Sequence, residues 1–185
     1  MRTRLPRRIA AALLCLSAGR LIACPAASAD VRLAKIFTDG MVLQREMPVP
    51  VWGWAQPGEK VTVTLDKQTA SATADEKGKW MVRLEALKSG GGPLEMTVAG
   101  KNTLTLKDIL VGEVWIGSGQ SNMQMSVSSS NNAAQEIAAS ENPKIRLFTV
   151  SDKVSGEPVA DLIASSGWEA CGPKTVGGFS AVAYF

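Results

Sequence analysis

The sequence predicts an all-β sandwich that is followed by the beginning of an α/β domain. The first half contains short runs of alternating polar and apolar residues, separated by Gly/Pro turns, which is typical of a sandwich. In the second half, a nearly continuous apolar run at residues 109–117 precedes a helix-like and a strand-like segment. We therefore divide the 185-residue chain into an export segment (1–29), a β-sandwich (30–107) and the start of an α/β domain (108–185).

The first 29 residues have the order of an export signal. Four arginines lie within residues 1–8, an apolar run follows at 9–16, and the Ala-Ser-Ala sequence at 27–29 offers a cleavage site. A second processing route stays open, because the sequence leading to Cys24 resembles a bacterial lipobox. We expect an exported protein, periplasmic or extracellular, that contacts no membrane unless it is lipidated at Cys24.

Charge and cysteine content exclude some classes of partner and linkage. The whole chain has 20 basic and 17 acidic residues, and removal of the five arginines in 1–29 leaves 15 against 17, a net charge of −2. No basic surface remains that would favour nucleic acid. Cys171 is the one cysteine left after cleavage, so no internal disulfide can form. The sequence contains no histidine.

Residues 30–107 supply about six strands. Residues 60–65 alternate strictly between polar and apolar, as a half-buried strand does. The other predicted strands are 47–54, 80–84, 94–98 and 104–106. Turns rich in Gly, Pro, Asp and Glu separate them at 56–59, 75–79 and 89–93.

The residues after 107 predict a different architecture. The run at 109–117 suits a strand that is covered on both faces, 132–140 suits an alanine-rich helix, and 145–150 suits a further strand. Strand, turn, helix and strand in this order predict the start of a parallel βαβ unit. Residues 151–178 read as loop, and Ser180 can cap a last short helix. Because the chain stops within an apolar segment, we expect it to be a truncated piece of a longer protein.

Ser121 is the candidate catalytic residue. It follows the apolar strand and precedes a helix, where a hydroxyl can point into a cleft and backbone N–H groups can face a developing oxyanion. Gly117 and Gly119 permit a sharp turn there. The residue types are also those of an ordinary turn. The segment is not a G-x-S-x-G elbow, because Met123 stands where the last glycine would be.

Residues 112–123, with the sequence Gly-Glu-Val-Trp-Ile-Gly-Ser-Gly-Gln-Ser-Asn-Met, closely resemble the nucleophile block of the sialate O-acetylesterase family of SGNH hydrolases. Further segments resemble the same family in order and spacing: 41–45, 48–55, 57–58, 91–93, 145–148 and 179–185. The resemblance covers about residues 31–185. It implies that the second region begins an SGNH-like, flavodoxin-like α/β hydrolase domain.

The resemblance also implies an activity, the removal of O-acetyl groups from sialic acid or related sugars without a metal or cofactor. Ser121 would form an acetyl-enzyme, a histidine oriented by an aspartate would take its proton, and the Ser121 N–H would belong to the oxyanion hole. Gln120 and Asn122 are further candidates for the oxyanion region, with turn-forming hydrogen bonds as their alternative role. The family's histidine and aspartate match nothing in this chain, so we expect these 185 residues alone to be inactive.

Several alternatives stay open at this level. The chain could be a non-catalytic carbohydrate-binding sandwich attached to a degenerate esterase remnant, or an acetylxylan-type esterase, because the motif addresses the acetyl group alone. Asp108 and Glu113 lie near the motif, but we expect them to flank the strand. The five tryptophans could stack on sugar rings, although core packing is the favoured prediction.

Overall fold

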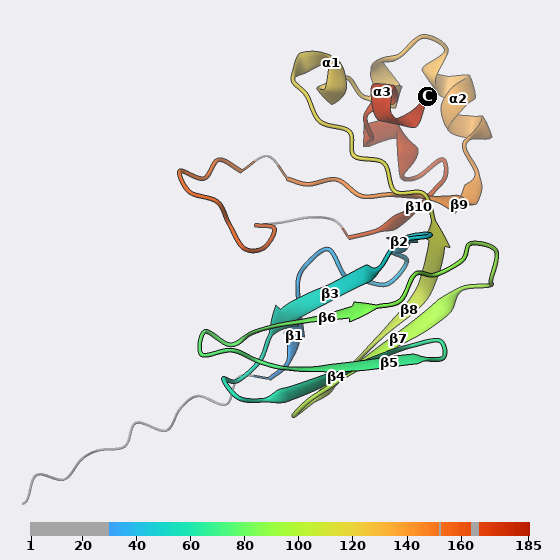
Figure 1. Ribbon diagram of the computed structural model, residues 1–185. Coiled ribbons are helices and arrows are strands. Elements are labelled where there is room, and N and C mark those ends of the chain that lie inside the picture. The colour runs from blue at the N-terminus through green and yellow to red at the C-terminus, as the bar shows by residue number, and fades with distance from the viewer. Residues whose placement is uncertain (1–29, 152, 164–166) are drawn as a thin grey trace, which may run out of the picture.

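A computed structural model (Figure 1) describes residues 30–151, 153–163 and 167–185. The expected export segment, with Cys24, lies outside these residues. The first region is a sandwich of two sheets. One sheet has the order β1 (Arg32–Leu33), β3 (Val49–Trp54), β6 (Lys79–Leu84). The other has the order β2 (Val42–Gln44), β8 (Thr103–Gly112), β7 (Leu94–Ala99), β4 (Lys60–Leu65), β5 (Gln68–Thr73).

The sandwich forms because alternate side chains of both sheets point into one core. The buried positions of β4 and β6 alternate with less buried ones, as the period of two requires. Val51 from one sheet and Val61, Val63 and Met96 from the other are all fully buried in this core. The strands predicted within residues 30–107 are confirmed, whereas β5 was missed because its sequence, Gln-Thr-Ala-Ser-Ala-Thr, has no large apolar residue.

Strand β8 continues through the boundary expected at 107/108. Ile109 is fully buried in the sandwich core, and Leu110 to Gly112 pair in parallel with β2. The sandwich therefore extends to Gly112. The prediction of a strand over 109–117 that is covered on both faces is wrong beyond this point, because Trp115 and Ile116 are 89% and 90% exposed.

The second region has short elements around a small core. Its elements are α1 (Ser121–Gln124), η1 (Val127–Ser129), α2 (Ala133–Ala139), β9 (Asn142–Leu147), β10 (Glu169–Cys171), η2 (Val176–Gly178) and α3 (Ala181–Tyr184). Helices α2 and α3 confirm the two predicted helices. The parallel βαβ unit is not formed by the described residues, because 113–117 has no strand partner there and β9 pairs antiparallel with β10. Residues 151–178, expected as loop, contain β10 and η2.

Arg146 joins the two regions. Its side chain is 7% exposed and donates two hydrogen bonds to the Asp108 carboxylate, at 2.6 and 3.1 Å, and one to the Gly40 carbonyl at 3.2 Å. Gly40 has a positive φ of 74°, and a Cβ there would lie 2.9 Å from Arg146 Nη1. Trp168 adds a second link, since its indole N–H donates to the Ile36 carbonyl at 2.8 Å. These contacts hold β9 and β10 against the end of the sandwich near β2 (Figure 1).

Candidate active site

Ser121 is the first residue of α1, at the end of the molecule opposite the hairpin formed by β4 and β5 (Figure 1). Its side chain is exposed, as are those of its neighbours Gln120 and Asn122. None of these three side chains hydrogen-bonds to another residue in the part of the chain that the structure describes. The predicted nucleophile and both oxyanion candidates therefore lie together on one open turn. The turn is held by the backbone carbonyls of Gln120 and Asn122, which accept the N–H groups of Gln124 and Met125, and not by these side chains.

The carboxyl side of this turn is fixed by residues 179–181. The Val127 N–H donates to the Phe179 carbonyl at 3.0 Å, and the Ala181 N–H donates to the Met125 carbonyl at 2.8 Å, on either side of a β-bridge between Ser126 and Ser180. The Ser180 hydroxyl caps α3 and also contacts Met123 Sδ at 3.2 Å. Residues 125–127, which follow the segment 112–123, are thus paired with the segment 179–185 close to Ser121.

Two glycines let the chain turn closely over Met123. A Cβ at Gly119 would lie 3.1 Å from Met123 Cβ, and one at Gly117 would lie 3.1 Å from Ala183 Cβ and 3.3 Å from Met123 Sδ. These separations are tighter than ordinary van der Waals contact. The glycines serve the packing of α1 against α3, in addition to any approach of a ligand.

The amino side of the segment is fixed where β8 ends. The Gln44 side chain accepts a hydrogen bond from the Val114 N–H at 2.8 Å and donates one to Glu113 Oε2 at 2.9 Å. Arg45 donates to the Gly112 carbonyl through its backbone N–H and to Glu113 Oε1 through Nε. The Gln44 hydrogen bond and, next, that of Arg45 lower the pKa of Glu113. This cluster joins two of the segments that resemble the family, 41–45 and 112–123, and nothing in their sequences indicates the contact between them.

No described residue hydrogen-bonds to the Ser121 hydroxyl as a general base would. Histidine, the usual base, is absent from the sequence. Glu113 is bound by Gln44 and Arg45, and Arg146 lowers the pKa of Asp108 through its hydrogen bond, so both carboxylates are poor proton acceptors. Asp108 lies within β8, whereas Glu113 directly follows its end. The described residues contain no group of three His, Cys, Asp or Glu side chains that could hold a metal ion.

The tryptophans divide between packing and exposure. Trp80 is buried, and Trp52, Trp54 and Trp168 are partly buried against the sandwich core, which confirms the packing prediction for four of the five. Phe37 meets Trp52 edge to face at 4.7 Å, and the Arg32 guanidinium lies 3.8 Å from the Trp54 ring. For Trp115 the packing prediction is wrong within the described structure, since it is exposed.

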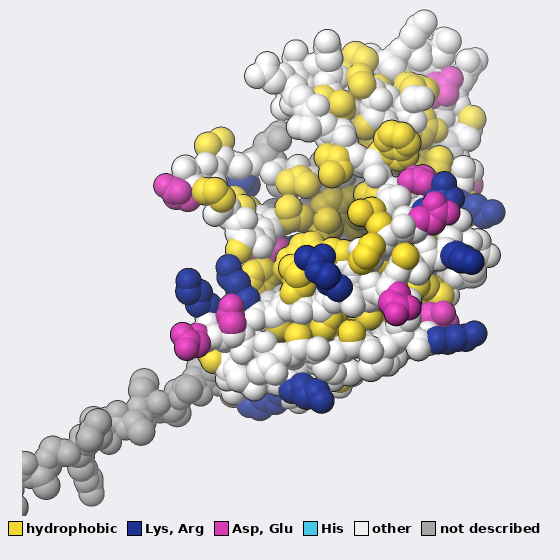
Figure 2. All heavy atoms as spheres, in the orientation of Figure 1, with side chains coloured by type: hydrophobic (Ala, Val, Ile, Leu, Met, Phe, Trp, Pro, Cys, Tyr) yellow, Lys and Arg dark blue, Asp and Glu magenta, His cyan; other side chains and the backbone are white. Residues whose placement is uncertain are grey.

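Apolar side chains gather on one face of the molecule. Figure 2 shows them around a hollow between the sandwich and the second region. The large apolar residues that are exposed after residue 112 are Trp115, Ile116, Met125, Ile145, Val150, Val154, Val159, Ile163, Val182 and Phe185. Exposed apolar surface on this scale is typical of a face that other protein covers.

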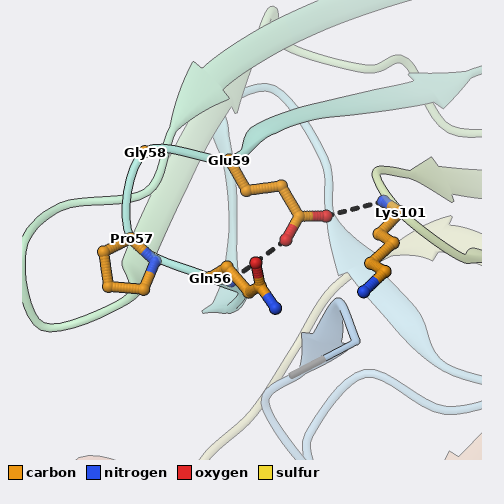
Figure 3. A pocket seen from close by; sticks show the side chains of 5 residues that line it. All are labelled: Gln56, Pro57, Gly58, Glu59 and Lys101. Atoms are coloured by element: carbon orange, nitrogen blue, oxygen red, sulfur yellow. Dashed lines mark hydrogen bonds between the residues drawn. The ribbon is translucent and has the colours of Figure 1, made fainter. Parts of the chain in front are cut away.

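A shallow depression elsewhere on the sandwich carries no candidate chemistry. It is lined by the turn Gln56-Pro57-Gly58-Glu59 and by Lys101 (Figure 3). The Glu59 carboxylate accepts hydrogen bonds from the backbone N–H groups of Lys101 at 2.6 Å and Gln56 at 3.0 Å, so both of its oxygens tie loops together.

Among the described residues, no helix is long and apolar enough to cross a bilayer.

Comparison with known proteins gives a consistent family. No family model matches the chain. The sialate O-acetylesterases of Mus musculus and Homo sapiens are 38% and 37% identical to it over 144 and 147 residues, 71% and 72% of this chain. A crystal structure of a carbohydrate acetylesterase from Xanthomonas citri superimposes with a TM-score of 0.80 at 38% identity, over 83% of this chain and 35% of that one.

The chain spans about a quarter of the curated relatives, 26% of the mouse and 28% of the human protein. The Xanthomonas structure is described as a carbohydrate acetylesterase, which is consistent with these two relatives. Over the part that it shares with them, the chain belongs to the sialate O-acetylesterase family.

Proposed function

We propose that the protein to which these residues belong is a serine esterase that removes O-acetyl groups from sialic acid or related carbohydrates, with Ser121 as its nucleophile. The observation that carries the proposal is the position of Ser121. It lies on an exposed turn that is fixed on both sides, within the segment that most closely resembles the family's nucleophile block. The names of the mouse, human and Xanthomonas proteins support the same class of substrate.

In the proposed reaction, Ser121 Oγ attacks the acetyl carbonyl while a histidine from outside this chain takes the hydroxyl proton. The bond between the acetyl carbon and the sugar oxygen then breaks, and the sugar leaves as an alcohol with that proton. Water hydrolyses the acetyl-enzyme to acetate and restores the serine. The Ser121 N–H, with Gln120 and Asn122 as neighbouring candidates, would stabilise the oxyanion. No metal or cofactor is proposed for these steps.

We further propose that the second region is completed into an SGNH-type α/β domain by more of the protein. The chain matches 35% of the Xanthomonas acetylesterase, and its segment 113–117 is apolar but exposed. A strand of this composition is stable when sheet neighbours and helices cover it. The exposed apolar face around the hollow in Figure 2 supports the same proposal.

The alternative of a non-catalytic, sugar-binding sandwich receives less support. A sugar platform needs open aromatic faces, whereas Arg32 covers one face of Trp54 and Trp52 packs against Phe37. The acetylxylan-type alternative concerns the same chemistry with a different sugar. It is tested by the choice of substrate.

The test compares the full-length gene product with its Ser121→Ala and Ser118→Ala variants on an aryl acetate, an O-acetylated sialic acid and acetylated xylan. We expect Ser121→Ala to lower kcat by at least about 10⁴-fold with unchanged circular dichroism. Ser118 lies on the same exposed turn, so its variant is the matched control and should remain active. Wild-type turnover in a folded Ser121→Ala variant would overturn the proposal.

We propose as well that the 185 residues alone are inactive, since they contain no histidine. Residues 30–185 would be assayed on the aryl acetate beside the full-length protein. Activity of this fragment that depends on Ser121 would mean that another residue serves as the base.

We also propose that the protein is exported and that residues 1–29 are removed. The intact mass of the exported protein distinguishes this cleavage from lipidation at Cys24.

A further inference from the structure

The eight residues 113–120, which connect β8 to α1, form no regular structure, yet they place the candidate nucleophile. Figure 1 shows this segment rising from the tip of β8 toward α1. Beyond its far end, on the other side of α1, residues 125–127 pair with residues 179–181. Its near end depends on side chains from β2, a strand that lies about 70 residues earlier and belongs to the sandwich.

Those side chains extend the hydrogen bonding between the parallel strands β2 and β8 past the point where their backbones stop pairing. The paired strands β2 and β8 end at Gln44 and Gly112, after which the Arg45 N–H still donates to the Gly112 carbonyl at 2.9 Å. Glu46 then turns away, with a positive φ of 61°, and its N–H bonds to the Leu87 carbonyl. The next donor of the segment, the Val114 N–H, is therefore taken by the Gln44 side chain.

We propose that Gln44, Arg45 and Glu113 form a positioning cluster that sets the direction in which the chain leaves the sandwich, and thereby the position of Ser121. The inference rests on the proposed role of Ser121 as nucleophile. These residues are positioning residues, because none of them lies on the turn that carries Ser121. Misplacement of a reacting group by about 1 Å costs on the order of 10²-fold in rate, so the cluster should act on kcat.

The hydrogen-bond polarity of the cluster is fully determined. Because Gln44 Oε1 accepts the Val114 N–H, its amide NH₂ must face residue 113, and Arg45 Nε is a second donor to the same residue. Residue 113 must accept both bonds, one through each carboxylate oxygen. A glutamine at 113 offers one acceptor and leaves a donor unmatched, while a glutamate at 44 places two carboxylates face to face.

The double exchange restores every match. In Gln44→Glu with Glu113→Gln, the new carboxylate at 44 accepts from both the Val114 N–H and the new amide at 113. The amide oxygen at 113 still accepts from Arg45 Nε. The exchange gives up the 3.4 Å contact from Gln44 Nε2 to the Arg45 carbonyl, and the bond from Arg45 Nε then goes to a neutral amide oxygen instead of a carboxylate. Rescue by the double variant is therefore specific to this geometry.

Gln68→Glu is the matched control. Gln68 lies on β5 and binds the Glu85 backbone in the same manner, accepting its N–H at 2.7 Å and donating to its carbonyl at 3.3 Å. Figure 1 places β5 at the far end of the sandwich from α1. The control therefore makes the same substitution, at a similar clamp of the same sandwich, without a connection to residues 113–120.

The experiment measures kcat and KM on an aryl acetate, the rate of Ser121 labelling by a fluorophosphonate, and thermal stability, all in the full-length gene product. Each single exchange should lower kcat and the labelling rate by about 10-fold to 100-fold with KM within about 2-fold. The double variant should recover to within about 3-fold of wild type, and Gln68→Glu should remain at wild-type rate.

Additive losses in the double variant, or an equal loss in Gln68→Glu, would overturn the positioning proposal. Failure of the proposed function has a different signature, namely an inactive wild type or an active Ser121→Ala variant. Amide hydrogen exchange of residues 113–121 decides the point independently of activity. Exchange should be faster in each single variant and normal in the double variant, and equal exchange in all four proteins would also overturn the proposal.

Discussion

The sandwich and the second region differ in how completely their own residues bury apolar side chains and pair strands. In the described structure, 19 apolar residues form one buried cluster in the sandwich, whereas five form the buried cluster of the second region. All of the strands in the sandwich pair with one another. The second region instead exposes Trp115 and Ile116 almost completely. We therefore expect the sandwich to fold by itself and the second region to depend on what is attached to it.

The difference also explains where the candidate site obtains its rigidity. Ser121 lies in the less complete region, but one of its two supports comes from Gln44 and Arg45 in the more complete one. A second cross-link, Arg146 to Asp108 and Gly40, runs between the same two regions. The sandwich is therefore the more completely packed region, to which the segment with Ser121 is attached.

Separating the two regions tests the comparison most severely. Residues 30–112 alone should unfold cooperatively, while 113–185 alone should lack a cooperative transition, because its small core cannot offset the entropy of ordering the chain. Circular dichroism during thermal unfolding measures both. A piece cut at residue 107 should be less stable than 30–112, since it loses Ile109 and the pairing with β2. A cooperative transition in 113–185 would contradict the comparison.

Matched leucine substitutions come next in size. Leu65 is fully buried in the sandwich, and Leu147 is 5% exposed in the small cluster. Leu65→Ala should lower the free energy of unfolding of residues 30–185 by about 2–5 kcal/mol. Leu147→Ala should lower global stability less, because the second region can open locally while the sandwich stays folded. Chemical denaturation gives both values, and equal losses would indicate a single cooperative unit.

Removal of the link between the regions should have a smaller effect. Arg146→Ala deletes charge-assisted hydrogen bonds of a nearly buried side chain, which costs about 1–3 kcal/mol. We expect faster proteolysis within residues 113–185 and little change in the sandwich. The control is Arg83→Ala, an exposed arginine on β6. Proteolysis at the wild-type rate in Arg146→Ala would show that the link is dispensable.

Lowering the pH should weaken the contacts of Asp108 with Arg146 and of Glu113 with Gln44 and Arg45. This is the smallest effect that we expect. Interactions with Arg146 lower the pKa of Asp108 from 3.8, and those with Gln44 and Arg45 lower the pKa of Glu113 from 4.5. A lowered pKa contributes stability that is complete above the ordinary value and is lost as pH falls through the lowered one. The melting temperature of wild type should exceed that of Glu113→Gln at pH 6, and the difference should shrink as the pH falls toward 3. A difference that grows as the pH falls would contradict this sign.

The sequence predicted the self-sufficient region well and the dependent one poorly. Alternation identified the strands now seen as β4 and β6 because each has one buried face. The run at 109–117 looked like one buried strand, but composition does not say which neighbours cover it, and in the structure its character changes at Gly112. Ser121 was found through a local segment. The cluster of Gln44 and Glu113 was not, since its members are 69 residues apart and polar.

The uninterrupted course of β8 has a consequence for how genes of this kind can exchange parts. From Ile109 in the sandwich core to Glu113 there are four residues and no spacer. A recombination crossover at 107/108, where composition changes, would cut through a paired strand. It would also take Gln44 and its hydrogen-bond acceptor Glu113 from different parents. Viable chimaeras should therefore inherit residues 103–112 with the sandwich and carry positions 44 and 113 from the same parent.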